Sequence, residues 1–434
     1  MRFSRLFKLV AVVENLVTPM ALELWLRFFL PKQKLKYQKL DNSLLYVAAS
    51  SLPYNISGYT IRTQSLLKAM QKAGLNVLVQ TRPGYPWDRH DCLVEALKEK
   101  TDVAGIIYNH AHKPTRYRPM LAFALQGASV IENAARKHRS SVIHSASNYA
   151  NALPALFAAR RLGIPFNYEM RGIWELSRIT HQPKFKNSSA YKLGIKLERL
   201  VAEHSDQVFV ISNELGMFIQ KEWGLEANKI KLLPNCINPD EIISPNVVED
   251  IEPMTIVYAG SLIAYEGLDI LLDALAILKQ QGKAVQLQIL GDGEERINLE
   301  AKTHDLSLQH SVKFLGRLSQ DKVKTIISRC ALVCIPRKSN KVCKIIPPFK
   351  LVESMFLGKA VVVPDLKVFK DELKEEGIAI FFKADDAEDL ARVINDGLKN
   401  IPKLCTVGKR AQQYVIHNRN WNKFIMPIVN INKN

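Results

Sequence analysis

Short apolar runs alternate with stretches of helical spacing along this chain, and that alternation restricts the folds open to it more than any other feature. The run Leu44–Ala49 is followed by a loop, and the helical stretch Tyr59–Ala73 then ends at Gly74, a residue suited to a helix C-cap. The pattern returns further along the first half of the chain, at Val142–Ser145, Ala152–Arg161, Phe166–Tyr168, Gln207–Ile211 and Lys231–Leu233. Repeated strand–helix–strand units pair their strands in parallel and place helices on both faces of the sheet. The sequence therefore predicts an α/β protein.

A second series of the same kind follows a proline-containing stretch, Asn238–Pro253, which we expect to be a hinge. The expected strands and first helix of this series are Thr255–Ala259, Leu268–Gln281, Gln286–Leu290, Val312–Phe314, Ala331–Ile335 and Ala360–Val363. A chain of 434 residues is long enough for two or three domains. We therefore expect two doubly wound, Rossmann-like domains, at 41–240 and 254–400, that face each other across a cleft. Residues 401–434 are expected to form a C-terminal helix, with a return to the first domain as one alternative.

The first forty residues, 1–40, form a basic amphipathic segment. They hold eight basic and two acidic residues, and apolar residues such as Leu9–Val13 and Trp25 lie between the charges. Such a stretch fits a helix on an anionic membrane surface, and a helix packed on the body of the protein is the alternative. Glu14 interrupts the apolar part, which argues against a cleaved signal peptide, and no uncharged run is long enough to cross a bilayer.

The overall charge also favours anionic partners. Lysine and arginine outnumber aspartate and glutamate by 60 to 42, which gives a formal net charge of +18. The sequence shows no zinc finger, aromatic platform or basic helix, so we expect a membrane surface and no nucleic acid. The six cysteines are too few and too irregularly spaced for a disulfide framework or a zinc site, which indicates a reducing compartment. The predicted location is the cytoplasm, at the inner face of the cell membrane.

Two short segments have the residues expected at an anion-binding site. Gly260 and Ser261 follow an expected strand and precede a helix whose N-terminus offers free N–H groups. Lys350 and Glu353 are spaced i, i+3 in a helix that Pro348 can begin, so they lie on one face of it. A lysine beside a carboxylate suits a ligand that bears a diphosphate and a ribose diol. A solvated Lys–Glu pair on a surface helix is the alternative.

Four blocks in the second half resemble the retaining glycosyltransferases of family four, which adopt the GT-B fold. The blocks are similar to the family's YxG(S/R)…(K/E)GLDxLLxAL, GDGxxR, VxFxG and LExM…GkPVV signatures, and they occupy Tyr258–Leu275, Leu290–Arg296, Val312–Gly316 and Leu351–Val363. Similar blocks in the first half lie at Ser57–Thr63, Val142–Ser147, Phe166–Glu175 and Leu233–Asn235. The third of these resembles a YExRGxWE motif from a subgroup linked to bacterial surface polysaccharide synthesis. The resemblance covers residues 44–400.

The resemblance implies where a nucleotide diphosphate sugar binds. The backbone at Gly260 and Ser261, helped by Gly58 of the first domain, would face the diphosphate. Glu353 would hold the ribose, and the backbone near Gly316 would read the base. The resemblance also places the acceptor in the first domain, beside His144, Glu169, Arg171, Trp174 and Glu175. A buried ion pair and a core tryptophan are the structural alternative for these five residues.

At four positions, Ala146, Ser261, Glu266 and Ile345, the chain lacks a residue that many family members have. The first and last replace a histidine and an acid found near the donor sugar in family members. The other two replace an arginine and a lysine that contact the diphosphate. Arg337 follows an expected strand at its carboxyl end, where open α/β sheets bind ligands. We expect Arg337 and Lys350 to supply the missing positive charge and to form the catalytic centre with Glu353.

These features predict transfer of a sugar from a nucleotide diphosphate donor to a glycan or lipid-linked glycan acceptor, with retention of anomeric configuration. Negative charge builds on the leaving diphosphate in such a transfer, so positive charge and N–H donors aimed there stabilise the transition state. No metal and no further cofactor is expected, because no DxD motif stands in a suitable strand context. Two alternatives remain open: a GT-B sugar-nucleotide epimerase, and a catalytically silent subunit that binds a sugar nucleotide or a glycan.

Overall fold

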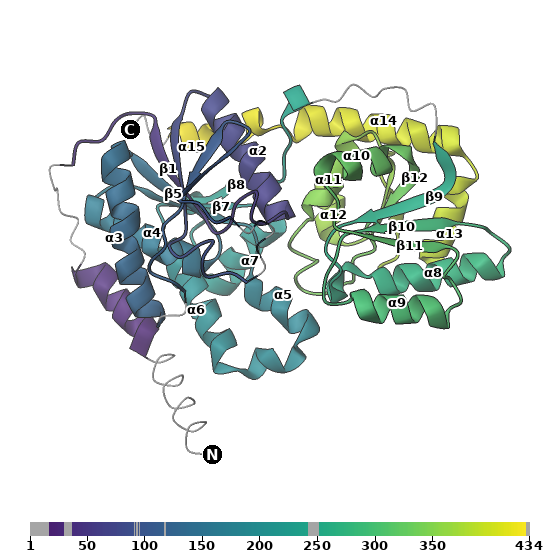
Figure 1. The fold of residues 1–434 in the computed structure, drawn as a ribbon, viewed down its shortest axis with the longest axis horizontal. Helices are drawn as coiled ribbons and strands as arrows, with labels where there is room; N and C mark the ends of the chain where they lie inside the picture. The colour runs from purple at the N-terminus through teal and green to yellow at the C-terminus, as the bar shows by residue number, and fades with distance from the viewer. Residues whose placement is uncertain are drawn as a thin grey trace, which may run out of the picture. The chain divides into compact units, whose positions relative to one another are not determined.

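The chain forms two α/β units in a computed structural model that describes residues 17–29, 37–90, 92, 94, 96–116, 119–241 and 251–430 (Figure 1). The first unit comprises Met1–Pro234 and Trp421–Asn434, and the second comprises Asn235–Asn420. The chain therefore leaves the first unit just before the stretch predicted as a hinge, and it returns to that unit at Trp421. Part of the predicted hinge, 242–250, lies outside the described residues.

The first unit is built on an eight-stranded sheet with the order β3-β4-β2-β1-β5-β6-β7-β8. Its strands are β1 Ser43–Ala48, β2 Asn76–Thr81, β3 Lys100–Val103, β4 Ile106–Asn109, β5 Val142–Ala146, β6 Phe166–Met170, β7 Gln207–Val210 and β8 Ile230–Leu232. All neighbours pair in parallel except β3 and β4, which form an antiparallel hairpin. The predicted α/β class is confirmed, whereas the hairpin was not predicted.

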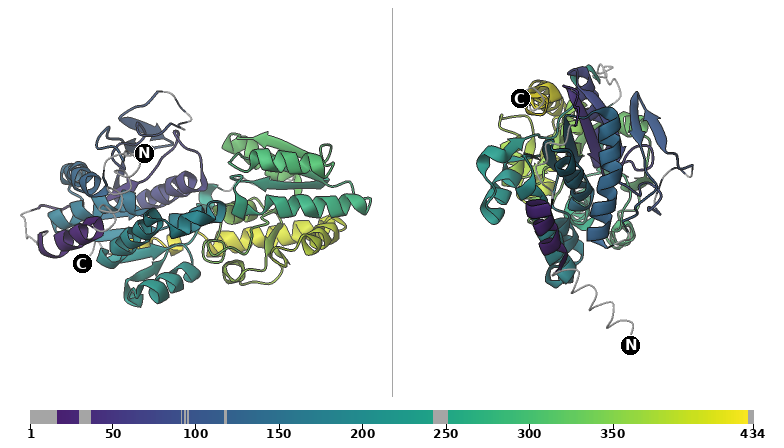
Figure 2. Two further views of the ribbon diagram at one scale, coloured as in Figure 1. Left: turned by 90° about the horizontal axis from the view of Figure 1, so that it is seen from below. Right: turned by 90° about the vertical axis from the view of Figure 1, so that its left-hand side faces the viewer.

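Helices cover both faces of this sheet (Figures 1 and 2). They are α2 Gly58–Lys72, α3 Met120–His138, α4 Tyr149–Leu162, α5 Trp174–His181, α6 Ser189–His204 and α7 Asn213–Trp223. Every residue of β1, β5 and β6 is buried, as expected for strands covered on both faces. Ser57 and Thr60 form a capping box that fixes the start of α2 at Gly58, directly after the loop that follows β1.

The second unit has a six-stranded, fully parallel sheet with the order β11-β10-β9-β12-β13-β14. Its strands are β9 Glu252–Ala259, β10 Gln286–Leu290, β11 Val312–Gly316, β12 Cys330–Cys334, β13 Val361–Pro364 and β14 Ile380–Phe382. Its helices are α8 Leu268–Gln280, α9 Arg296–Asp305, α10 Gln320–Arg329, α11 Phe349–Phe356, α12 Lys367–Glu372, α13 Ala387–Leu398 and α14 Ile401–Asn418. The strand order reverses between β9 and β12, and ligands of open α/β sheets bind at the carboxyl ends of the strands beside such a reversal.

The C-terminal region is not the single helix that we expected over 401–434. Helix α14 ends at Asn418, where the Asn420 side-chain amide donates to the Ile416 carbonyl and satisfies a free acceptor of the last turn. A short turn at Trp421–Lys423 and α15 Met426–Asn430 follow in the first unit. The Trp421 indole N–H donates to Ser65 Oγ of α2 at 2.7 Å, which attaches this segment to the first unit.

A helix near the N-terminus covers residues 17–29, its last turn being the π-helical segment η1 Trp25–Phe29. Leu22 and Leu26 are buried on the first unit, and Glu23 pairs with His204 of α6 at 3.0 Å. The helix is thus held on the body of the protein by one of its faces. The rest of the basic segment predicted over 1–40, namely 1–16 and 30–36, lies outside the described residues. Among the described helices, none is both long enough and apolar enough to cross a membrane.

Candidate functional site

Three glycines line the carboxyl ends of β9, β10 and β11 in the second unit. The Gly260 N–H donates to the Leu290 carbonyl, and the Gly291 N–H donates to the Gly316 carbonyl, both at 2.8 Å. A Cβ at Gly291 would clash with the Gly260 carbonyl oxygen, and Gly291 has a φ of +132°. Only glycine allows these strand ends to approach so closely, which leaves a floor of bare backbone at this edge of the sheet.

Lys350, in the first turn of α11, reaches over this floor. Its Nζ lies 2.8 Å from Glu266 Oε2 and 2.7 Å from the Tyr258 hydroxyl, whose own hydrogen is donated to the Ser261 carbonyl at 2.7 Å. A Cβ at Gly260 would clash with the Lys350 ammonium. The predicted donor-site residues Gly260, Ser261 and Lys350 are therefore in one place.

Arg337 approaches the same carboxylate from the end of β12. Its Nη2 and Nε lie 2.6 and 3.2 Å from Glu266 Oε1, and its Nη1 donates to the Ile346 carbonyl at 2.8 Å. Burial disfavours the ionised form of Glu266, but Arg337 and Lys350 outweigh it and lower the Glu266 pKa to about 2.

Glu266 changes the charge expected at this edge. The sequence suggested two free cations, Arg337 and Lys350, and treated Glu266 only as a position that lacks a lysine. The structure places a buried carboxylate between the two cations, so the three groups carry a net charge of +1. The pairing also orients both cations, because each binds an oxygen of the same Glu266 carboxylate and Arg337 is only 7% exposed.

Glu353 lies one turn along α11 from Lys350 and is half-buried. Its carboxylate accepts no hydrogen bond within the described parts of the chain. Burial raises the pKa of Glu353 to about 7, against the opposing charges of Lys324 and Lys350. A carboxylate with free acceptor oxygens is suited to a ligand that brings two hydroxyl donors, such as a ribose.

The first unit contains a second, largely buried ionic cluster around Glu169 of β6. Arg62 of α2 donates to Glu169 Oε1 from Nη2 at 2.9 Å, and Arg171 donates to Oε1 from Nε at 2.9 Å and to Oε2 from Nη2 at 3.0 Å. Tyr46 of β1 donates its hydroxyl to Oε2 at 2.8 Å. Burial opposes ionisation of Glu169, yet the two guanidiniums hold its pKa well below the ordinary value. Sequence reasoning missed the roles of Arg62 and Tyr46. Arg62 lies in the Ser57–Thr63 block, which gave it no role of its own, and the only signal of Tyr46 was its place in a predicted strand.

The remaining predicted acceptor-side residues do not gather in one exposed site. His144 is fully buried and stacks on Tyr46, with 5.3 Å between ring centroids. Glu175 is buried against Gly194, and burial raises its pKa. Trp174, in contrast, is 66% exposed, so the alternative of a core tryptophan is wrong. Four of the five predicted residues thus lie in the interior of the first unit, and Trp174 alone presents its ring to solvent. Gly58, the predicted phosphate-side glycine, lies at the start of α2 in this unit.

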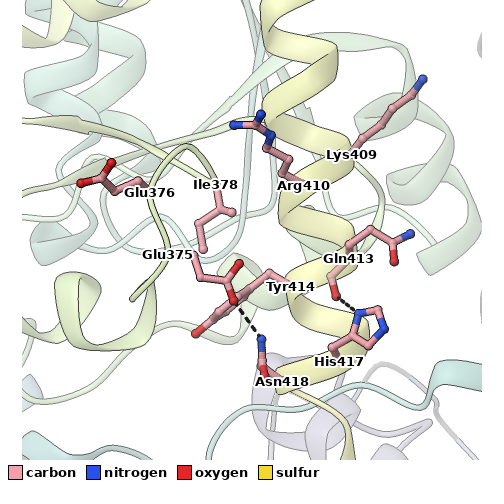
Figure 3. A pocket seen from close by; sticks show the side chains of 9 residues that line it. All are labelled: Glu375, Glu376, Ile378, Lys409, Arg410, Gln413, Tyr414, His417 and Asn418. Atoms are coloured by element: carbon pink, nitrogen blue, oxygen red, sulfur yellow. Dashed lines mark hydrogen bonds between the residues drawn. The ribbon is translucent and has the colours of Figure 1, made fainter.

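A groove of about 560 Å³ lies elsewhere on the second unit, between the segment after α12 and helix α14 (Figure 3). Its lining residues are Glu375, Glu376, Ile378, Lys409, Arg410, Gln413, Tyr414, His417 and Asn418. None of them is among the residues predicted to bind the donor, and none lies in the loops directly after β9, β10, β11 or β12. We therefore regard the glycine-lined edge as the candidate site.

Comparison with known families matches both halves of the chain. Residues 57–236 match the model described as glycosyl transferase 4-like domain, and residues 240–414 match the model described as glycosyl transferases group 1. The chain is a glycosyltransferase of the GT-B type. The second match contains the whole glycine-lined edge together with Arg337, Lys350 and Glu353.

Curated relatives of this glycosyltransferase are distant. An uncharacterised glycosyltransferase of Bacillus subtilis is 24% identical over 64% of this chain and 73% of its own length. The amylovoran biosynthesis glycosyltransferase of Erwinia amylovora is 24% identical over 42% of this chain and 47% of its own. A phosphatidyl-myo-inositol mannosyltransferase of Mycobacterium leprae is 25% identical, over 42% of this chain and 48% of its own. The chain thus spans about half the length of the latter two relatives.

Solved structures share the fold over almost the whole glycosyltransferase. The sucrose-phosphate synthase of Thermosynechococcus elongatus superposes with a TM-score of 0.72 at 15% identity, over 90% of this chain and 98% of that one. The Anabaena protein HepE, solved in complex with UDP and glucose, superposes with a TM-score of 0.65 at 18% identity, over 89% of this chain and 98% of its own. These likenesses confirm the predicted GT-B fold with its two Rossmann-like domains.

Proposed function

We propose that this glycosyltransferase moves a sugar from a nucleotide diphosphate donor to a glycan or lipid-linked glycan, and that the anomeric configuration is retained. The observation that carries the proposal is the position of the Lys350 ammonium directly against Gly260, where the sheet order reverses. Arg337 stands beside it, and Glu353 offers a carboxylate with free acceptors one helical turn away. A cation over exposed backbone suits a diphosphate, and a free carboxylate suits a ribose.

The donor's diphosphate would bind beside the Lys350 ammonium and the Ser261 backbone, at the edge that Gly260 keeps free of a side chain. Bond cleavage at the sugar places negative charge on this diphosphate, and the fixed cations stabilise that charge in the transition state. Because Glu266 already orients Lys350 and Arg337, little reorganisation is needed when the charge develops. This account assigns the task to the two cationic side chains and the Ser261 backbone, since the Gly260 N–H is already bonded to Leu290, so we expect turnover to continue when divalent metal is chelated. HepE, which shares the fold, was solved with UDP and with UDP-glucose, and this supports a uridine donor as the first to test.

A lipid-linked acceptor agrees with the N-terminal helix, residues 17–29. Its inner face is buried at Leu22 and Leu26, whereas Met20 and Phe28 are 62% and 70% exposed. Further exposed apolar side chains of this helix are Val17, Leu24 and Trp25. An apolar stripe that faces away from the body is suited to the interface of a bilayer, and the net charge of +18 favours an anionic one. We therefore propose peripheral attachment to the inner face of the cell membrane. Two relatives, named for amylovoran biosynthesis and for phosphatidyl-myo-inositol, support a membrane-bound polymer or lipid as acceptor.

A catalytically silent sugar-nucleotide-binding subunit is the second candidate, favoured by one observation. Glu266 neutralises one of the two cations at the site, at a position where many family members have a lysine. A site with a net charge of +1 binds a diphosphate but stabilises the leaving group less than a more positive site would.

Titration calorimetry with UDP and GDP, followed by donor turnover, tests the proposal. We expect one nucleoside diphosphate to bind, Lys350→Met to weaken that binding at least tenfold, and Glu388→Gln, an exposed acid on α13, to leave it unchanged. Turnover of the matching donor sugar separates an enzyme from a silent subunit, and the anomeric signal of the product in NMR reports retention. If neither nucleotide binds to the unaltered chain, the proposal is wrong.

A further inference from the structure

An exposed pair of stacked rings lies at the carboxyl edge of the first unit's sheet. Trp87 belongs to the loop after β2, and His112 belongs to the loop after β4. Their ring centroids are 3.4 Å apart and their planes differ by 24°. His112 is exposed and Trp87 is half-buried, so the stack forms part of the surface. Neither ring was singled out by the motifs that identify the family.

Buried contacts hold the two loops in place. Arg82 and Asp88 form a two-pronged ion pair with both N–O distances at 2.6 Å, and Asp88 also accepts the Arg116 backbone N–H at 3.2 Å. The Gly84 N–H donates to the Ala111 carbonyl at 2.7 Å. These bonds join the loop of Trp87 to the loop of His112, so the stack is built before any ligand arrives.

A third ring supports the stack from below. His110 is buried, and its two ring nitrogens lie 2.9 Å from the hydroxyls of Thr81 and Thr101. The edge of its ring approaches Trp87, with 6.5 Å between centroids. Burial lowers the pKa of His110 to about 4, so this support is uncharged at neutral pH and adds no repulsion beneath the platform.

The surroundings of the stack are basic. The two loops, 82–90 and 110–116, contain four arginine or lysine residues and one aspartate, a net charge of +3. Asp88 is already paired with Arg82, whereas Lys113 and Arg116 are exposed. A ligand at this surface therefore meets a flat aromatic face and nearby positive charge.

We propose that the Trp87–His112 stack binds the sugar-phosphate end of the acceptor, an inference that rests on the proposed function. A pyranose ring presents a face of C–H groups to the electron-rich face of an aromatic ring, and a phosphate on that sugar meets Lys113 and Arg116. The location agrees with this role, because ligands of open α/β sheets bind beyond the carboxyl ends of the strands. The binding class is thus a glycosyl phosphate, either free or as the head of a lipid.

Binding of glucose 1-phosphate to the full chain, followed by saturation-transfer NMR, tests this assignment. We expect glucose 1-phosphate to bind more tightly than methyl α-glucoside or inorganic phosphate. Trp87→Ala and His112→Ala should each weaken glucose 1-phosphate binding on the order of tenfold, whereas Trp87→Phe should keep most of the affinity of the unaltered chain. Lys113→Ala should weaken glucose 1-phosphate but leave methyl α-glucoside unchanged. Met217→Ala, which removes an exposed apolar side chain of α7, is the matched control.

Vesicles that contain a polyprenyl phosphoglucose distinguish the two sources of the ligand. If the protein binds these vesicles better than plain vesicles, and Trp87→Ala abolishes the difference, the ligand is a lipid headgroup. If Trp87→Ala weakens only the binding of free glucose 1-phosphate, the ligand is a soluble sugar phosphate. UDP titration of the same variants separates this inference from the proposed function, since UDP affinity should not change. The assignment is overturned if folded Trp87→Ala and His112→Ala proteins bind both forms as the unaltered chain does. It is also overturned if neither form binds, or if a single-stranded oligonucleotide binds at the stack in their place.

Discussion

The carboxylate of Glu266 should stabilise the second unit and at the same time weaken its affinity for anions. Glu266→Gln distinguishes the two effects, because it should lower the stability and raise the affinity. The substitution keeps the shape of the side chain and removes the charge that Arg337 and Lys350 share. The Glu266 pKa of about 2, against a reference value of 4.5, corresponds to about 3 kcal/mol of stability at neutral pH. Because its folded-state pKa is lowered, this contribution is present above about pH 5 and is lost as the pH falls toward 2. We therefore expect Glu266→Gln to lower the free energy of unfolding by about 3 kcal/mol at pH 7 and to remove that part of the acid sensitivity.

The same substitution should strengthen nucleotide binding. It raises the net charge of the three-residue cluster from +1 to +2, and a unit charge about 6 Å from a phosphate contributes about 3 kcal/mol at an effective dielectric constant of 20. Screening by salt and water reduces this, so we expect UDP to bind on the order of tenfold more tightly. Urea unfolding and calorimetry, each with Glu388→Gln as the control, measure the two effects. An unchanged or weaker UDP affinity in a folded Glu266→Gln protein would refute the reasoning that Arg337 and Lys350 face the diphosphate.

Three further outcomes follow from the described contacts. UDP affinity, measured by calorimetry, should fall as the pH drops below about 7, because Glu353 then gains a proton and loses an acceptor for the ribose. The Glu353→Gln protein should lack this fall in affinity and should show only the pH dependence that comes from the titration of UDP itself. Glu169→Gln should destabilise the first unit by about 3–5 kcal/mol in urea unfolding, because the buried guanidiniums of Arg62 and Arg171 lose their counter-charge, and a change under 1 kcal/mol would contradict this. Phe28→Ser should lower partition onto anionic vesicles without altering UDP affinity, and equal partition at low salt would remove the membrane proposal.

The order of strands and helices could be predicted because buried parallel strands leave a local signal. Runs such as Leu44–Ala49 and Ala331–Ile335 are apolar throughout, and the structure places strands there. Strand β3 of the hairpin lacks that signal, because three of the four residues of Lys100–Val103 are polar or charged and the strand lies at the edge of the sheet. Its partner β4 also pairs in parallel with β2, and no local pattern encodes that arrangement.

The candidate site was predictable only in part, for a related reason. Gly260 stood out because it lies in a recognisable block, and Lys350 stood out because of its i, i+3 spacing to Glu353. The structure brings the Lys350 ammonium against Gly260. The sequence did not indicate that Glu266 binds both cations, because Arg337 is 71 residues away from it. The Glu169 cluster was similarly hidden, since Arg62 and Glu169 are separated by 107 residues. Contacts between side chains from distant elements depend on how the sheet assembles, and only the tertiary structure reveals them.

The most direct test of the central claim is a crystal structure of the full chain with UDP. We predict density for the diphosphate within hydrogen-bonding distance of Lys350 Nζ and of the Ser261 backbone, with the ribose on Glu353. Density for UDP in the groove beside α14, or at any place where Lys350 and Arg337 touch no phosphate, would contradict the account.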